Sequence, residues 1–130
     1  MPVIGYKITK VLAERKEGKI EGVSYNLKIE GVKKRENGIY EILFSAPIDY
    51  GVAGKMEICG AIIFKEEQER DLVQEWENNK RLPDDVAEQV LNAALFQTSV
   101  QATILANTVR LLPPIQFPRI RIRRREGQGG

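Results

Sequence analysis

The side chains that most enzymes use for acid–base and nucleophilic chemistry are scarce in this sequence. It contains no histidine and a single cysteine, Cys59. Histidine is the usual general base and a frequent zinc ligand, and a Ser–His or Cys–His nucleophile pair requires it. Cys59 lies in an apolar run, where a free thiol is usually a small buried hydrophobic group. We therefore expect a protein that is not an enzyme and that uses no cofactor.

Two further segments contain residue types that could bind a metal ion or a phosphate. The segment 51–55, Gly-Val-Ala-Gly-Lys, lacks the spacing and the Ser or Thr of a phosphate-binding P-loop. A carboxylate-rich run, which we interpret as the solvated start of a helix rather than a metal site, consists of Glu66, Glu67, Glu69 and Asp71. Neither segment predicts catalysis.

Basic residues are concentrated near the C-terminus of the sequence. The cluster consists of Arg119, Arg121, Arg123, Arg124 and Arg125. Such a run can contact nucleic-acid phosphates or an acidic partner. It is equally typical of an edge strand protected by charge and followed by a solubilising tail. We favour the second interpretation, because Phe117 alone makes no platform for stacking bases.

Length and composition favour one domain. The chain has 130 residues, of which 42% are hydrophobic, and its formal net charge is +2. We expect a single α+β domain over residues 1–123 and a flexible basic and glycine-rich tail over residues 124–130. The near balance of charges argues against a polyanion-binding protein as a whole. A lone cysteine, no signal-like start and no long apolar run predict a cytoplasmic protein without membrane insertion.

Four segments between residues 3 and 65 alternate apolar and polar residues, as half-buried strands do. The clearest is Val23 to Ile29. Short connections favour an antiparallel four-stranded meander, and Asn37-Gly38 predicts a hairpin with a type I′ turn. Gly60, in the middle of the fourth strand, predicts close approach of another backbone.

The pattern changes to a helical period after Phe64. Residues 66–80 predict a short helix whose apolar positions include Trp76, which we interpret as a core residue. Residues 82–112 predict a long helix without an internal glycine or proline. This helix is apolar on more than one side, so the sheet can cover only one side. We expect a second copy to cover the other, including Val100 and Ile104, in a dimer or tetramer.

Two stretches carry a resemblance to a known family. The long helix is followed by Pro113-Pro114-Ile115-Gln116-Phe117, and the last strand contains Glu57-Ile58-Cys59-Gly60-Ala61-Ile62-Ile63-Phe64. Together with four strand-like segments before the helix, they resemble the SecB-type protein-export chaperones and their SecB-like relatives. The resemblance implies a SecB-like fold with an antiparallel four-stranded sheet and a long C-terminal helix, and in this chain we expect the short helix between them.

The resemblance also implies an activity. The implied activity is that of an ATP-independent holdase linked to protein export. Such a holdase binds unfolded or precursor polypeptides through exposed apolar grooves. The residues of this chain that fit such a groove are Tyr50, Ile115 and Phe117. Family members that dock on the translocation motor use an acidic surface, whereas this chain is slightly basic. The helix predicted at 66–80 is a second departure, so docking to that motor is not expected.

A different class of function fits the same residues. The chain can be an oligomeric interaction module that is not a chaperone and binds RNA through its arginine-rich C-terminus. Suppression of client aggregation distinguishes the first hypothesis from salt-dependent binding of nucleic acid, which is expected of the second.

Overall fold

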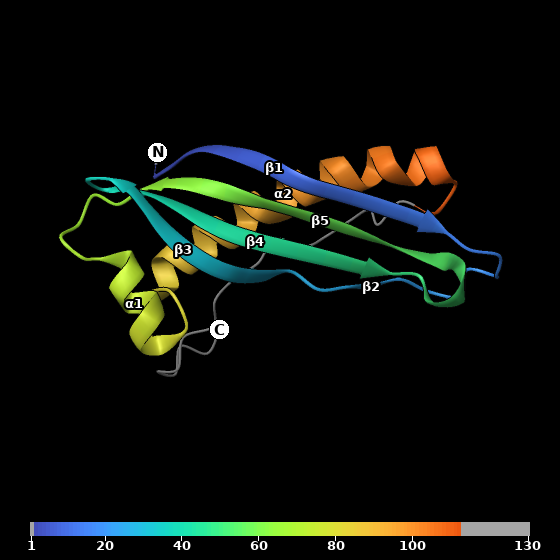
Figure 1. Ribbon diagram of the computed structural model, residues 1–130, viewed down its shortest axis with the longest axis horizontal. Coiled ribbons are helices and arrows are strands. Elements are labelled where there is room, and N and C mark those ends of the chain that lie inside the picture. The colour runs from blue at the N-terminus through green and yellow to red at the C-terminus, as the bar shows by residue number, and fades with distance from the viewer. Residues whose placement is uncertain (1, 113–130) are drawn as a thin grey trace, which may run out of the picture.

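The computed structural model describes residues 2–112 and shows an antiparallel sheet with a long helix along one face (Figure 1). The strands are β1 (Val3–Arg15), β2 (Ser24–Tyr25), β3 (Lys28–Glu36), β4 (Ile39–Asp49) and β5 (Gly54–Lys65), with a 3₁₀ turn, η1 (Gly51–Ala53), before β5. Two helices follow, α1 (Leu72–Asn79) and α2 (Asp84–Val109). The predicted α+β class is confirmed. Within residues 2–112, no helix has the length and apolarity that crossing a bilayer requires.

The order of the strands differs from the predicted meander. β1 pairs with β5 rather than with the next strand in the chain, β5 pairs with β4, and both β2 and β3 pair with β4. The meander prediction was therefore wrong. β4 and β5 are the most extensively buried strands, and strands buried in this way need a neighbour on each side. The segment between β1 and β2 crosses to the far side of β4, which leaves β1 at an edge.

The strand predicted at Val23 to Ile29 is divided in two, which gives five strands rather than four. Tyr25 pairs with Ile48 and Lys28 pairs with Ser45, so the interruption lies opposite Ala46 and Pro47. Proline has no N–H to donate to a strand ladder. At this point one backbone bond remains, from Asn26 N–H to the Pro47 carbonyl (3.2 Å).

The two glycine predictions have different outcomes. Gly38 has a φ of 75°, but Asn37 is not among the residues with positive φ. A type I′ turn needs positive φ at both positions, so that prediction was wrong, and a register shift precedes the turn instead. At Gly60 the prediction is confirmed: a Cβ atom there would collide with the Lys7 carbonyl oxygen and lie 3.1 Å from the Phe44 ring.

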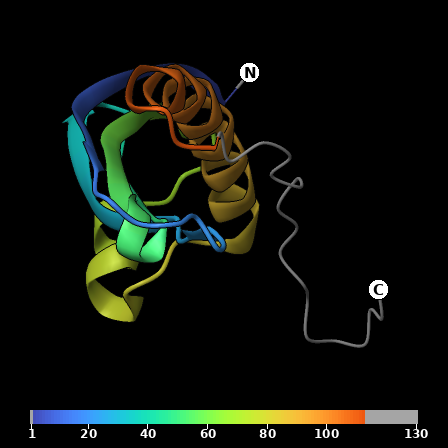
Figure 2. The ribbon, with the colours of Figure 1, turned by 90° about the vertical axis from the view of Figure 1, so that its right-hand side faces the viewer.

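Helix α2 covers one face of the sheet, and Figure 2 shows the sheet curving around that side. Its fully buried positions recur every fourth residue: Val86, Val90, Ala94, Thr98, Ala102 and Ala106. A row at this spacing winds slowly around a helix, which suits packing on a twisted sheet. The first half of α2 packs with Tyr40, Phe44 and Ile62, and the second half with Ile48, Met56 and Ile58.

Helix α1 begins at Leu72, later than predicted, because Asp71 caps it. The Asp71 carboxylate accepts hydrogen bonds from Val73 N–H (3.0 Å) and Gln74 N–H (3.3 Å), which satisfies two free donors of the first turn. Leu72 is buried, and Trp76 packs against the first half of the core as predicted.

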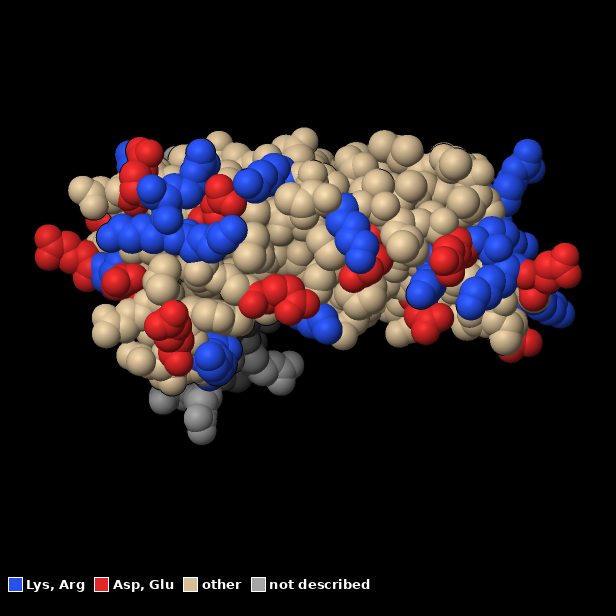
Figure 3. Space-filling model, in the orientation of Figure 1, with Lys and Arg blue, Asp and Glu red and all other residues tan. Residues whose placement is uncertain are grey.

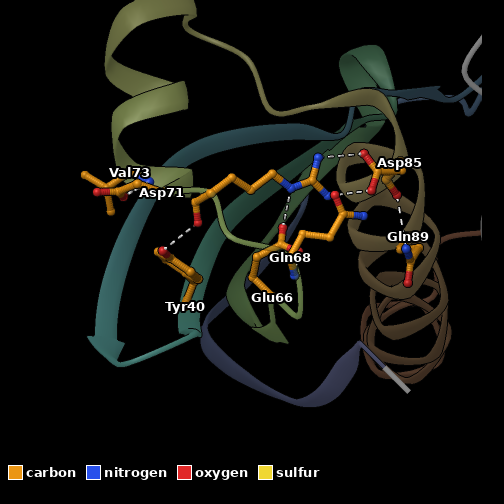
Figure 4. A network of polar contacts seen from close by, with 8 residues as sticks. Tyr40, Glu66, Gln68, Asp71, Val73, Asp85 and Gln89 are labelled. Carbon is orange, nitrogen blue, oxygen red and sulfur yellow. Dashed lines mark hydrogen bonds and ion pairs between the residues drawn. The ribbon is translucent and has the colours of Figure 1, made fainter.

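Ion pairs hold the segment between β5 and α1 against the start of α2 (Figure 4). The Arg70 guanidinium donates to Glu66 (Nε–Oε2, 2.8 Å) and to both carboxylate oxygens of Asp85 (2.6 and 3.2 Å). Arg70 lowers the pKa of Asp85, chiefly through this hydrogen bond. The Glu66 side chain is almost fully buried. Our interpretation of Glu66 as part of a solvated helix start was therefore wrong.

Candidate functional site

Helix α2 carries a row of exposed apolar side chains opposite its buried row. Phe96 is 65% exposed and Ile104 is 55% exposed, with Val100 between them. Residues four apart lie on one side of an α-helix, so the three form a continuous row, which we call the outer row. The sequence-predicted interface residues Val100 and Ile104 both belong to it. This arrangement fits the expectation that one side of α2 is left for another molecule.

The edge strand β1 also exposes apolar side chains. Ile4, Tyr6 and Val11 are about half exposed, whereas Val3 and Ile8 pack against the core. Within the described residues, β1 pairs on one side only, with β5. An edge strand presents unpaired backbone N–H and C=O groups. β1 therefore offers both apolar side chains and backbone hydrogen bonds to another molecule.

An open groove of about 580 Å³ lies between the start of β1 and the middle of α2. Ile62 and Leu95, both buried, lie in its lining, and Tyr6 and Phe96 are its exposed aromatic rings. The remaining lining residues are Val3, Gly5, Asn92, Ala93, Gln97 and Ser99. None of the ten is Asp, Glu, Lys or Arg. Such a lining suits apolar side chains of an uncharged segment and has amides and a hydroxyl for hydrogen bonds.

Tyr50, a predicted polypeptide-binding residue, lies in the core and not on an exposed surface. It is 1% exposed, and its hydroxyl donates a hydrogen bond to the Leu112 carbonyl (2.5 Å). Burial raises the pKa of the Tyr50 phenol. At the same end of α2, Arg15 Nη1 donates to the Arg110 carbonyl (2.9 Å). These two bonds fix the point at which the chain leaves α2. Nearby, Val52 in η1 is 66% exposed.

The other sequence-predicted site residues lie outside the described residues. They are the polypeptide-binding candidates Ile115 and Phe117 and the polyanion-binding candidates Arg119, Arg121, Arg123, Arg124 and Arg125. The expected tail over residues 124–130 lies outside them too. Of the three predicted polypeptide-binding residues, Tyr50 alone belongs to the described residues, and it does not line the groove.

Sequence reasoning missed Tyr6 and Phe96. The spacing of Phe96, Val100 and Ile104 is visible in the sequence and could have predicted the outer row. Tyr6 could not be joined to it, because the pairing of β1 with β5 is what brings the start of β1 beside α2.

Cys59 lies on β5 near the Glu57 carboxylate (Sγ–Oε2, 3.8 Å). Cys59 is partly buried on β5, and burial, together with the nearby Glu57 carboxylate, raises the pKa of its thiol. A raised pKa keeps a thiol protonated and unreactive at neutral pH. Residues 2–112 contain no group of three or more Cys, Asp or Glu side chains that could hold a metal ion.

Comparison with known proteins defines the fold but not a sequence family. No protein-family model matches the chain, and no curated protein matches it in sequence. Among solved structures, the fold is that of a SecB-like chaperone. One similar structure is the Mycobacterium tuberculosis Rv1957 SecB-like chaperone in complex with a ChAD peptide from the Rv1956 HigA1 antitoxin. Its TM-score is 0.61 at 15% identity, and the alignment covers 91% of this chain and 89% of that one.

Proposed function

We propose that the protein is an ATP-independent chaperone of the cytoplasm, a holdase that binds unfolded or precursor polypeptides in the groove between β1 and α2. The observation that carries this proposal is the groove itself, which is open, apolar and free of charged side chains. Exposed apolar surfaces of this kind mark interaction sites. The shared fold with a SecB-like chaperone supports the same activity.

The groove suits a segment of unfolded chain because its aromatic rings are already exposed. A phenylalanine side chain contributes roughly 200 Å² of surface, so the 65% of Phe96 that is exposed amounts to about 130 Å². Covering that area with an apolar client side chain is worth at most about 3 kcal/mol at about 25 cal/mol per Å². One such contact gives weak and reversible binding, as a holdase requires. Stronger holding needs several grooves acting together.

We further propose that the protein forms a dimer or tetramer through the second half of the outer row, with Val100 and Ile104 at the contact and Phe96 left in the groove. Val100 and Ile104 lie beyond the groove on the same side of α2 and are exposed in the single copy. The adjacent edge of β1 extends this surface. An oligomer would place several grooves in one particle, which supports multivalent holding of one client.

The chaperone proposal is tested by aggregation of a chemically denatured client protein, followed by light scattering. We expect the wild-type protein to suppress aggregation without ATP. Phe96→Ser should weaken suppression strongly, because it removes the exposed ring from the groove. Val52→Ser is the matched control, since Val52 is equally exposed but lies in η1.

Two results would contradict the proposal. Absence of suppression by the wild-type protein would exclude the holdase. Loss of suppression in Val52→Ser, with Phe96→Ser active, would instead locate the client site at the loop that contains Tyr50 and Val52. Circular dichroism of both variants should confirm that each is folded.

A further inference from the structure

The sheet face that points away from α2 carries a concentrated group of positive charges at one end. Figure 3 shows this face, with Lys and Arg side chains gathered over the start of β1 and the end of β3. At the centre of the group, the Glu41 carboxylate bonds Lys7 Nζ (3.1 Å) and Arg35 Nε (3.5 Å). Lys33 is directly opposite Glu41 in the register, so it lies on the same face. Lys65, two residues from Ile63 on β5, shares that face by alternation.

The carboxylates on this face do not neutralise these cations. Lys7, Lys33, Arg35 and Lys65 contribute four positive charges. Glu41, and Glu36 at the edge of the group, which is opposite Ile39 in the register and so shares this face, contribute two negative charges, which leaves a local net charge of +2. Glu41 is only 13% exposed, whereas Lys7 and Arg35 are about half exposed. At the centre of this face an approaching molecule therefore meets Lys7 and Arg35 before it meets Glu41. We call the four cations and Glu41 the basic face.

Further along the sheet, away from the basic face, two other carboxylates lie among the polar and basic side chains. Glu30 accepts a hydrogen bond from Ser45 Oγ (2.5 Å), and Glu57 pairs with Lys10 (2.9 Å). The basic face lies at the end of the sheet near the β3–β4 turn. The net charge of the whole chain is only +2, so the local excess of positive charge arises from the fold. Lys7 and Lys33 come from strands at opposite edges of the sheet, and the sheet places them on one face.

Between the cations the sheet carries aliphatic side chains, of which Leu43 is partly exposed and Ala61 and Ile63 are buried. Leu43 and Ala61 occupy neighbouring positions on β4 and β5, and Gly31 lies on the other side of Leu43 in the register. Ile63 is next to Ala61 on the same face. An aliphatic side chain of a partner can pack against Leu43, and none of these residues has an aromatic ring on which a nucleic-acid base could stack. The aliphatic residues between the cations therefore favour a polypeptide partner over a single-stranded nucleic acid.

We propose that the basic face is a docking surface for an acidic polypeptide segment of another protein. Carboxylates of the segment would pair with Lys7, Lys33 and Arg35, and its aliphatic side chains would contact Leu43. The arginine-rich end of this chain is excluded as the occupant, because it has the same sign of charge as the face. The groove lies on the helix side of the sheet and the basic face on the opposite side, so both can be occupied at once.

The test uses three fluorescent probes and measures their association by anisotropy. The first is a peptide of alternating glutamate and leucine, the second has glutamine in place of glutamate, and the third is a single-stranded oligonucleotide. We expect the acidic peptide to bind most tightly and its affinity to fall with added salt. Phe96→Ser should leave this binding unchanged, which separates it from client binding in the groove.

Charge variants locate the binding site. The double variant Lys33→Gln/Arg35→Gln should lower the association rate of the acidic peptide by about tenfold, because complementary charges mainly steer association. The control Lys16→Gln/Lys19→Gln removes the same charge from the loop after β1 and should have little effect. Glu41→Gln should tighten binding, because it removes the carboxylate at the centre of the basic face.

Three outcomes would overturn the proposal. The acidic peptide could bind no better than the neutral peptide, or both double variants could lose equal affinity, which would indicate attraction to net charge alone. Tighter binding of the oligonucleotide, lost in the Lys33→Gln/Arg35→Gln variant, would assign the surface to nucleic acid. None of these results bears on suppression of client aggregation, so the holdase proposal is tested separately.

Discussion

Replacement of Ile104 by glutamate tests whether the outer row of α2 is a contact between copies of the chain. Ile104 is 55% exposed in one copy and lies in the middle of the second half of the helix. In an isolated copy the substitution exposes a charge to water and removes little packing. We expect the free energy of unfolding of such a copy to change by no more than about 0.5 kcal/mol.

In an oligomer the same substitution has a large effect. Fully burying an isoleucine is worth about 1.5–3 kcal/mol, so covering the exposed half of Ile104 contributes about 1 kcal/mol per copy. In a contact with twofold symmetry, Ile104 of both copies is covered, which contributes about 2 kcal/mol to the free energy of association. Burying an unpaired carboxylate at the contact adds a further penalty of at least ~1–3 kcal/mol. The dissociation constant should therefore rise by at least about a hundredfold.

Sedimentation velocity over a range of concentrations measures this change, and thermal unfolding at low concentration reports the stability of the separate copies. Val52→Glu is the control, because it adds the same charge to a residue of similar exposure in η1. An unchanged mass distribution in Ile104→Glu would refute the assignment of the outer row. A wild-type protein that sediments as a single copy at high concentration would refute self-association altogether.

Two stability predictions follow from the fold. Gly60→Ala should lower the free energy of unfolding by roughly 1–3 kcal/mol in denaturant titrations, because the new Cβ would collide with the Lys7 carbonyl. Gly22→Ala is the control: its Cβ meets no atom within 4 Å, so the free energy of unfolding should change by no more than about 0.5 kcal/mol. Equal effects of the two substitutions would contradict this reasoning. Asp85→Asn should destabilise the protein at neutral pH but not in strong acid. Arg70 lowers the pKa of Asp85 in the folded state, so the carboxylate contributes stability above its unfolded pKa of about 3.9 and loses it as the pH falls through the folded value. A difference between wild type and Asp85→Asn that is constant with pH would show that charge is not the cause.

The candidate site was only partly predictable. Val100 and Ile104 were predicted to lie on the side of α2 that the sheet does not cover, because the helix is apolar on more than one side, and both are exposed. Tyr50 was placed among exposed groove residues, but it is buried and bonded to Leu112. The sequence around Tyr50 shows a loop, and a loop pattern does not say whether an aromatic side chain points into the core.

Local patterns in the sequence determined the elements of this protein. The alternating residues of β4 and β5, such as Ile42 and Ile62, lie in the core as their period predicts, and the change of period after Phe64 separates strands from helices. Such patterns are local because the side chains of a strand alternate between two faces, whatever its neighbours are. The role of Gly60 was also predictable from a local pattern, since a glycine inside a strand indicates the close approach of another backbone.

Tertiary structure alone decided which strands are neighbours and which apolar residues stay exposed. β1 could pair with β2 or with β5 without any change in its own pattern, and the choice depends on the competition among all strands for positions in one sheet. That choice places Tyr6 beside Phe96 and so creates the groove. It also places Lys7 on the same face as Arg35, with Glu41 between them. Residues far apart in the chain formed both surfaces, so neither could be read from a local pattern.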